Sequence, residues 1–324
     1  MMDTAPLSQS KSDNTLLPQP VVFSFLSRPD ATSLADRRRN PAHMLNKLGE
    51  PLSDVEAQKA ENAFGNEEGI NFEKWSEYWR KVHGPRFTYV EAPDDKSLAV
   101  LKRYDQLHRL PAGPSSDFPA PYEPPLDADN RLFPTVIGHI PQYRRPAWDG
   151  AAYLVFEHRV EIPVLFSSAR VIEKILPEDR VIFRDIAPMI ADQFILKEGK
   201  KDDEAVTLIK THVRAQTMLD RDAFQSRWLK ANAALFQRSP EIFSTVSRYV
   251  QLHNAGGTKP GEHFFDPDMS VIDGISLTSF STVASLERFL TSNAYHELLE
   301  AEAAISEPSG GEFWTAINFS VIQD

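Results

Sequence analysis

Two tyrosine–glutamine–histidine trios are the residues of this chain whose types and spacing best suit chemistry. Residues 103–108 read Arg-Tyr-Asp-Gln-Leu-His, and residues 248–253 read Arg-Tyr-Val-Gln-Leu-His. Histidine exchanges a proton near neutral pH, a tyrosine hydroxyl can polarise a carbonyl or donate to an enolate, and glutamine orients a substrate without titrating. We therefore expect enolisation, cyclisation, dehydration or decarboxylation of an oxygenated carbon skeleton.

Each trio lies on a predicted strand, and the alternation of side chains along a strand places its three members on one face. On the opposite face of the second strand, Val246, Val250 and Leu252 are apolar and suit contact with a helix. We therefore expect both trios to face a shared cavity. The alternative is structural, because a tyrosine or histidine on a strand is more often a satisfied core residue than a catalyst. The predicted substrate contacts are Gln106, Tyr249, Gln251, His253 and, from another strand, His212.

The predicted catalytic residues are His83, Tyr104 and His108. His83 precedes a Gly-Pro pair at the end of a predicted helix, where it combines a titratable group with a break in the backbone. In the alternative interpretation it only interacts with the negative end of the helix dipole. The equivalent position in the second half of the chain is Asn232, so we expect the active end to lie in the first half. There His83 or His108 would act as acid or base, and Tyr104 would donate to an oxyanion.

The two trios are part of an internal duplication. Asp273-Gly274 repeats Asp149-Gly150 at a spacing of 124, and the same spacing pairs Glu302 with Glu178 and Ser292 with Ser168. Upstream, Phe224 and Trp228 repeat Trp75 and Trp79 at a spacing of 149. The duplication predicts two similar structural units in one chain.

Hydrophobic periodicity gives both units the order β-α-β-β-α-β. This order forms an antiparallel sheet with both helices on one face, so the bare face must be buried. The predicted fold is α+β: two tandem ferredoxin-like units packed sheet to sheet as an α+β barrel, with the functional cavity between the sheets. The expected strands are 21–27, 100–108, 153–156, 189–196, 206–213, 246–253, 275–280 and 313–322; the expected helices are 72–82, 160–176, 221–236 and 283–303.

The remaining segments complete the predicted domain organisation. Residues 1–20 form a flexible arm, and the first unit spans 21–198 with insertions at 31–70 and 109–147. A polar linker at 199–205, expected to be solvated, leads into the second unit at 206–324. Nine prolines lie within 111–146, which favours a long irregular excursion that closes over the end of the strand carrying His108.

Composition narrows the class of partner. The chain has 324 residues, a formal net charge of −11 and no cysteine. The charge disfavours nucleic acid and anionic membranes, and the lack of cysteine excludes thiolate chemistry. No histidine set has metal-ligand spacing, so we expect no metal and a small-molecule substrate. No signal peptide or apolar span is evident, so we expect a cytoplasmic location. We also expect a homodimer that uses surfaces outside the barrel core.

Residues 75–85, Trp-Ser-Glu-Tyr-Trp-Arg-Lys-Val-His-Gly-Pro, together with the later Arg-Tyr strand and the Asp149-Gly150 pair, resemble the EthD-like branch of the dimeric α+β barrel superfamily. The resemblance covers roughly 72–108 and 148–196, and it is weaker in the second copy, where Asn-Ala-Ala replaces His-Gly-Pro. It implies a ferredoxin-like unit that pairs across its sheet. Relatives include cofactor-free polyketide cyclases, muconolactone-type isomerases, dehydratases, small monooxygenases and tandem haem proteins.

The leading hypothesis is a cofactor-independent acid/base enzyme, a lyase or isomerase, acting on a hydrophobic oxygenated, aromatic or polyketide-like metabolite. A cofactor-free monooxygenase stays open within the same family. A haem-binding enzyme is a second hypothesis, with His212, His253 or His296 as the iron ligand. The third is a non-catalytic protein that only binds a small molecule.

Overall fold

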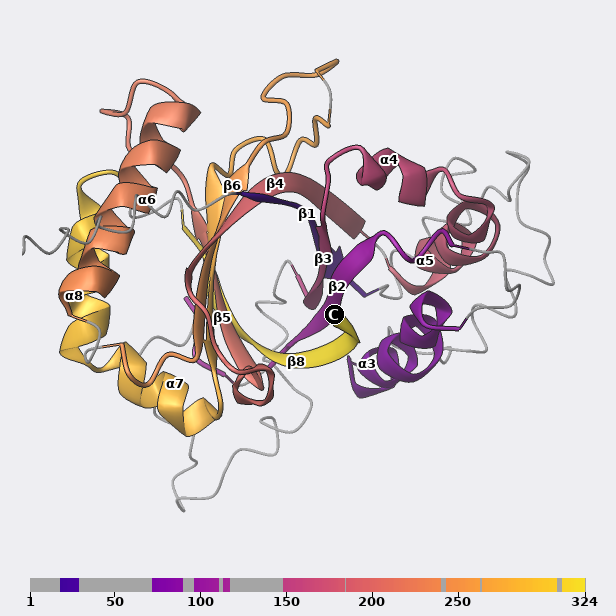
Figure 1. The fold of residues 1–324 in the computed structure, drawn as a ribbon, viewed down its shortest axis with the longest axis horizontal. Coiled ribbons are helices and arrows are strands. Elements are labelled where there is room, and N and C mark those ends of the chain that lie inside the picture. The colour runs from indigo at the N-terminus through magenta and orange to yellow at the C-terminus, as the bar shows by residue number, and fades with distance from the viewer. Residues whose placement is uncertain are drawn as a thin grey trace, which may run out of the picture.

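The computed structural model describes residues 18–28, 72–89, 96–110, 113–116, 148–183, 185–239, 243–262, 264–307 and 311–323. The predicted insertion 31–70 lies outside these residues, as do residues 1–17 of the predicted arm and most of the insertion 109–147. Eight described strands form one closed antiparallel barrel in the order β1-β3-β2-β8-β5-β7-β6-β4 (Figure 1). The strands are β1 (Gln19–Ser27), β2 (Leu101–Arg109), β3 (Gly150–Phe156), β4 (Asp185–Lys197), β5 (Val206–His212), β6 (Arg248–Asn254), β7 (Gly274–Phe280) and β8 (Phe313–Gln323).

The barrel consists of two four-stranded sheets with the same topology. The first unit contributes β4-β1-β3-β2 and the second β8-β5-β7-β6. The sheets join edge to edge, because β2 pairs with β8 and β4 pairs with β6. The predicted fold of two ferredoxin-like units forming an α+β barrel is therefore confirmed. Closure leaves neither sheet with an unpaired edge, which removes the row of open backbone groups that an isolated unit would expose.

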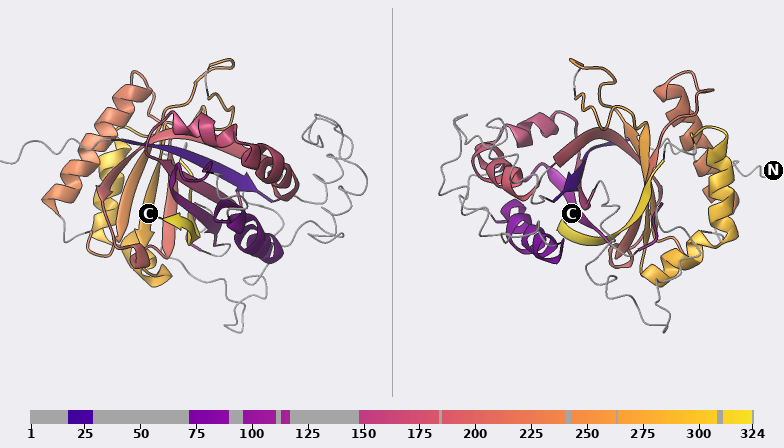
Figure 2. Two further views of the ribbon diagram at one scale, coloured as in Figure 1. Left: turned by 45° about the vertical axis from the view of Figure 1, so that its right-hand side comes forward. Right: turned by 180° about the vertical axis from the view of Figure 1, so that it is seen from behind.

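Helices cover the outside of the barrel, those of the first unit on one side and those of the second unit on the other (Figure 2). The predicted helices 160–176 and 283–303 are each interrupted. Ser168 and Ser292, which are equivalent in the duplication, accept hydrogen bonds from Val171 N and Tyr295 N at 3.3 Å and so start a new helical segment. The first unit carries α3 (Phe72–Tyr78), η2 (Trp79–His83), η3 (Gly84–Phe87), α4 (Glu161–Phe166), η5 (Val171–Ile175) and α5 (Leu176–Ile182), and the second α6 (Arg221–Arg238), α7 (Val283–Leu290) and α8 (Asn293–Ala303).

The interior of the barrel is packed. Phe23, Phe25, Leu107, Leu252 and Trp314 belong to one hydrophobic cluster to which strands of both sheets contribute. Further clusters lie between the sheets and their helices. The space between the sheets, where the sequence predicted a functional cavity, is thus a shared core. Among the described helices, none combines the length and the apolar character needed to cross a bilayer.

The predicted linker 199–205 is not wholly solvated. It contains a short helix, η6 (Lys201–Asp203), and Glu204 is only 6% exposed. The carboxylate of Glu204 accepts a hydrogen bond from Arg103 Nη2 at 2.6 Å and lies 3.9 Å from Arg248 Nη1. These arginines are the first residues of the two repeated segments, so the linker carboxylate connects equivalent points of the two units. The prediction of a solvated linker is wrong at Glu204, because this charge compensates two buried guanidinium groups.

A tryptophan packs against a glycine at the same place in each unit. A Cβ added at Gly150 would stand 2.8 Å from Cζ3 of Trp79, and one added at Gly274 would stand 2.6 Å from Cζ3 of Trp228. The Asp-Gly pair of the duplication therefore has a steric reason, because only a residue without a side chain lets the indole lie this close to the strand.

We predict that Gly150→Ala and Gly274→Ala each lower the free energy of unfolding by ~1–3 kcal/mol, because the indole and its helix must move away from the sheet. Urea unfolding followed by tryptophan fluorescence measures the loss. A change below ~0.5 kcal/mol for both variants, the usual size for a harmless surface substitution, would contradict this packing.

Candidate active site

The first trio lies between the sheet and the helices, on the face opposite to the one predicted. Gln106 Nε2 donates to the Trp79 carbonyl at 2.9 Å, and the His108 ring stacks on the Trp79 indole with centroids 4.3 Å apart. Tyr104 belongs to the hydrophobic cluster between the first sheet and its helices, together with Trp79. Leu107, on the other face of the strand, belongs to the cluster inside the barrel.

The second trio has the same arrangement. The His253 ring stacks on Trp228 with centroids 5.3 Å apart, and Asn232 Nδ2 donates to the Tyr249 hydroxyl at 2.8 Å. Gln251 Oε1 lies 3.0 Å from His253 Nε2. The prediction that both trios face the space between the sheets is wrong. Every residue of β6 is buried, so the apolar face and the polar face of this strand are both covered and polarity could not tell them apart.

Burial changes what the trio histidines can do. His108 Nδ1 lies 2.7 Å from Ser76 Oγ and its Nε2 lies 3.2 Å from Gln106 Oε1. Burial, with a smaller effect of Arg80, lowers the pKa of His108 to about 3, and burial likewise lowers the pKa of His253 to about 3. Both rings are therefore neutral near pH 7. Burial also raises the pKa of Tyr104, which is 1% exposed.

His83 is held between two carboxylates. Its Nδ1 lies 3.0 Å from Glu178 Oε2, and its Nε2 lies 3.3 Å from Asp179 Oδ1. The Tyr78 hydroxyl donates to the other oxygen of Glu178 at 2.7 Å. Burial raises the pKa of Asp179 to about 6. This cluster ties η2 to α5 and engages both nitrogens of the imidazole. A catalytic role for His83, Tyr104 and His108 stays a prediction that would require these buried groups to become accessible.

The second unit places a different set of charged groups beside a cavity of about 600 Å³. Lys210 Nζ on β5 donates to Glu302 Oε2 on α8 at 2.5 Å, and His212 Nε2 lies 4.0 Å from Glu302 Oε1. His212, a predicted substrate contact, lines this cavity, and so does His296, which the sequence named as a candidate iron ligand. The lining residues are Ser116, Lys210, Thr211, His212, Leu290, Tyr295, His296, Leu299, Glu302, Ala303, Ser306, Glu307, Gly311 and Phe313.

The electrostatics of this set favour an ionised carboxylate beside a neutral imidazole. Burial alone would raise the pKa of Glu302, but the attraction of Lys210 and then of His212 leaves that pKa below its usual value. Burial lowers the pKa of His212 to about 4, with Glu302 opposing the shift. Burial also raises the pKa of Tyr295 to about 12, so its hydroxyl stays protonated near pH 7. The cavity wall thus offers a base, a cation and a hydrogen-bond donor.

Comparison of the repeats explains why the second unit is open at this point. In the first unit, Phe183 packs edge-on against Trp79 and His83, with centroids 5.8 and 6.0 Å apart. At the repeat spacing of 124, Ile182 and Phe183 correspond to Ser306 and Glu307, which line the cavity. Two apolar residues that fill the first unit are therefore replaced by polar ones in the second. Ser306 Oγ is buried and has no hydrogen-bond partner among the described residues.

The first unit also contributes to this cavity. Ser115 forms a β-bridge with Trp314, Ser116 N donates to the Phe313 carbonyl at 2.9 Å, and Ser116 lines the cavity. The described start of the proline-rich segment, residues 113–116, therefore runs along β8 toward the second unit. The prediction that this segment closes over the end of the strand carrying His108 concerns residues that otherwise lie outside the described ranges.

Sequence reasoning missed Lys210 and Glu302 as site residues. They are 92 positions apart, and only the fold brings β5 and α8 together. One signal was available, because Glu302 repeats Glu178, and the two glutamates occupy equivalent places beside Asn232 and His83. Across the described residues, no group of three or more histidine, aspartate or glutamate side chains could hold a metal ion.

The topology defines the chain as an α+β barrel made of two ferredoxin-like units. No protein-family profile matches it, and no curated protein matches it in sequence. Solved structures with a similar arrangement include a "putative monooxygenase" from Lactobacillus acidophilus NCFM, with TM-score 0.43 and 9% identity, covering 94% of this chain and 97% of that one. An anthrone oxidase-like protein has TM-score 0.45 and 8% identity, covering 94% and 93%. A mutant chlorite dismutase from Candidatus Nitrospira defluvii has TM-score 0.36 and 10% identity, covering 93% and 91%. Scores at this level say nothing about the chemistry of this chain.

The depressed histidine pKa values predict acid sensitivity. His108, His212 and His253 have folded pKa values of about 3, 4 and 3, below the ordinary 6.5, so their contribution to stability is present above pH ~6.5 and lost as the pH falls toward ~3–4. Asp179, with its pKa raised to about 6, works in the opposite direction. At pH ~5 these four groups together bind about two more protons in the unfolded chain than in the folded one, which contributes ~3 kcal/mol per pH unit to the slope.

Denaturant unfolding between pH ~7 and pH ~5 measures this slope. We expect His253→Asn to flatten it by about one proton and Asp179→Asn to steepen it by about one proton, because each removes one shifted group. Stability that is independent of pH over this range, or an Asp179→Asn variant with a flatter slope, would contradict the placement of these groups.

Proposed function

We infer that this chain is a cofactor-independent acid/base enzyme and that its active site is the cavity of the second unit. The observation that carries this inference is the Lys210–Glu302 ion pair, which stands with His212 in the wall of a cavity of about 600 Å³. A carboxylate that is ionised near pH 7 can accept a proton, and a fixed cation beside it can stabilise the anion that results. The volume falls within the ~300–1,000 Å³ typical of small-molecule sites.

The roles of the residues follow from their charges. The Glu302 carboxylate would take the proton from a carbon next to a carbonyl, and the Lys210 ammonium would stabilise the enolate oxygen. Tyr295 can donate a hydrogen bond to the same oxygen. His212 Nε2, which lies 3.0 Å from Ser276 Oγ and 4.0 Å from Glu302 Oε1, would relay a proton within the site. Isomerisation, cyclisation and elimination can proceed from such an enolate, and decarboxylation of a β-keto acid would generate an enolate that the same groups could stabilise.

The walls of the cavity indicate the class of substrate. Leu290, Leu299 and Phe313 provide apolar contact, and Lys210, His212 and Glu302 are polar residues of the same lining. This combination suits a hydrophobic metabolite with an oxygenated end, such as an aromatic or polyketide-like compound. A protein that only binds such a compound would use the same walls, so the experiment must measure turnover.

Exchange of the α-proton for deuterium tests the proposal without knowledge of the natural substrate. With benzoylacetone or a related aromatic diketone in D₂O, NMR should show exchange above the buffer rate. Glu302→Gln should reduce the enzymatic rate by ~10²–10⁴-fold, because it removes the base. Glu178→Gln is the matched control, since it makes the same change at the repeat-equivalent position, and it should retain the rate.

The opposite pattern would locate the chemistry elsewhere. If Glu178→Gln or His83→Asn abolished exchange while Glu302→Gln preserved it, the active end would be in the first unit, as the sequence predicted. Binding of the diketone without enzymatic exchange would favour the binding-protein hypothesis. Circular dichroism of each variant separates loss of rate from loss of fold.

A haem enzyme is the second candidate, favoured by one observation. His296 lines the same cavity, and its Nδ1 lies 2.8 Å from the Ser292 carbonyl, a contact that fixes the tautomer with Nε2 available to a metal. The charged inner wall at Lys210 and Glu302 suits a macrocycle less well than a polar substrate. Titration with haemin should shift its Soret band on binding, and His296→Ala should abolish that shift; a Soret band that the protein leaves unchanged excludes the candidate.

We also propose that the chain is a diverged tandem relative of the EthD-like branch of the dimeric α+β barrel superfamily. The support is the sequence of residues 75–85 together with the topology of each unit. In the second copy, Asn-Ala-Ala replaces His-Gly-Pro, and Ala303 stands where the first copy has Asp179. Lys210 supplies the partner of Glu302 there, so the chemistry of this copy would differ from that of the motif. A homodimer and a cytoplasmic location stay predictions.

A further inference from the structure

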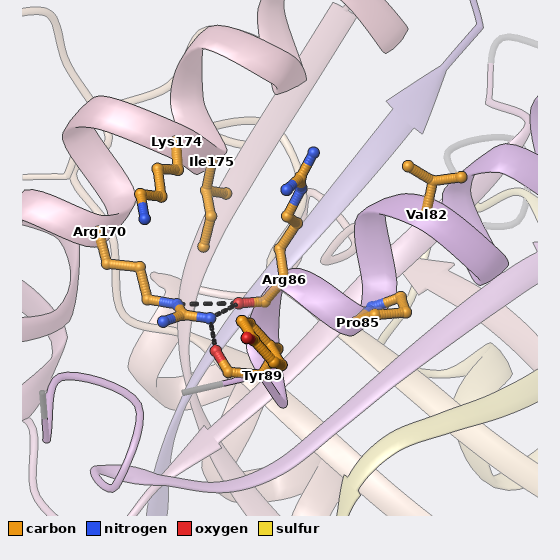
Figure 3. Close-up of a pocket in the computed structure, with 7 residues that line it drawn as sticks. All are labelled: Val82, Pro85, Arg86, Tyr89, Arg170, Lys174 and Ile175. Carbon is orange, nitrogen blue, oxygen red and sulfur yellow. Dashed lines mark hydrogen bonds between the residues drawn. The ribbon is translucent and has the colours of Figure 1, made fainter. Parts of the chain in front are cut away.

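A second cavity lies on the outer side of the first unit, far in sequence from Lys210, His212 and Glu302 of the proposed active site. It is a groove of about 230 Å³ between η2 and η3 on one side and η5 on the other (Figure 3). Three of its seven lining residues are cationic, and none is acidic. The groove is lined by Val82, Pro85, Arg86, Tyr89, Arg170, Lys174 and Ile175.

Arg170 is built into the groove. Its side chain donates from Nε and Nη2 to the Arg86 carbonyl at 2.9 and 2.6 Å, and Nη2 also donates to the Tyr89 carbonyl (Figure 3). The residue is only 8% exposed. A guanidinium group held this way keeps its charge in one place, so an anion that binds nearby would not have to order it.

Arg86 is the more adaptable cation. Its side chain is 46% exposed, and its Nε lies 3.4 Å from Glu178 Oε2, a long contact for an ion pair. Lys174 on η5 lies one turn after Arg170 and brings a third positive charge to the groove. In a chain with a net charge of −11, this groove brings three cationic side chains together, with Glu178 as the carboxylate beside Arg86.

We propose that this groove is a binding subsite for a compact anion with a small apolar body, either a phosphate monoester or a carboxylate. Arg86 and Lys174 would bind the anionic oxygens in the field of Arg170, and Val82, Pro85 and Ile175 would contact the apolar part. The volume is below the ~300–1,000 Å³ of sites for drug-sized ligands, so the ligand is small or only one end of it enters. The inference is independent of the proposed active site in the second unit.

Occupancy would be sensed by the first-unit cluster. Glu178 accepts from Arg86, lies 3.0 Å from His83 Nδ1 and also accepts from Tyr78. An anion that draws Arg86 away therefore leaves Glu178 to His83 and Tyr78 alone. The ring resonances of His83, which does not line the groove, should therefore report binding of the anion.

Calorimetric titration of the full chain with phenyl phosphate, inorganic phosphate and benzoate tests the subsite. We expect saturable binding of phenyl phosphate or of benzoate, weaker binding of inorganic phosphate, and a shift of the His83 ring resonances on binding. A tighter complex with phenyl phosphate than with benzoate indicates a phosphate monoester, and the reverse order indicates a carboxylate. Arg86→Gln and Lys174→Gln should each weaken binding by about tenfold, because each removes a charge-assisted contact.

Lys81→Gln is the matched control. Lys81 is on η2, next to the groove residue Val82, and its side chain is 59% exposed. It donates to Glu77 at 2.5 Å and does not line the groove, so the loss of its charge should leave binding unchanged. An equal loss in Lys81→Gln would mean non-specific attraction and would overturn the proposal. So would the absence of saturable binding at millimolar concentration.

Discussion

The close packing of a tryptophan on a glycine fixes the architecture of each unit. Trp79 lies against Gly150 and Trp228 against Gly274, so each indole touches the sheet directly. The histidine of each trio stacks on its tryptophan, and this contact commits the trio to the space under the helices. The opposite faces of the same strands are then free to build one core shared by both sheets. The position of each helix and the orientation of the strand beneath it follow from this contact, and the pairings of β2 with β8 and of β4 with β6 then close the barrel.

The two units share this contact and differ in what surrounds it. In the first unit, Phe183 and the His83–Glu178–Asp179 cluster fill the space beside the tryptophan. In the second unit, Ser306 and Glu307 stand at the positions of Ile182 and Phe183, and Lys210 and Glu302 line a cavity of about 600 Å³. Among the described residues, each unit therefore retains a histidine near a carboxylate, and in the second unit these groups belong to the wall of that cavity. Duplication preserved the support of the fold and let the polar groups diverge.

The sequence predicted the elements well because repetition supplied each strand twice. The predicted orientation of the trios is wrong, because both faces of these barrel strands are largely buried. The alternation of apolar and polar residues then does not show which face points into the barrel. Breaks in the second helix of each unit were missed, although the equivalent serines Ser168 and Ser292 were the signal. The pairing of Lys210 with Glu302 could not be read from spacing, because it depends on how β5 and α8 meet.

We expect the substrate to bind in the second unit and not in the first. A crystal of the protein soaked with an enolisable aromatic diketone would reveal where the ligand binds. We expect ligand density in the cavity beside α8, with an oxygen within hydrogen-bonding distance of Lys210 Nζ and the acidic carbon facing Glu302. Density against Tyr104 and His108 in the first unit, with the second-unit cavity empty, would contradict it.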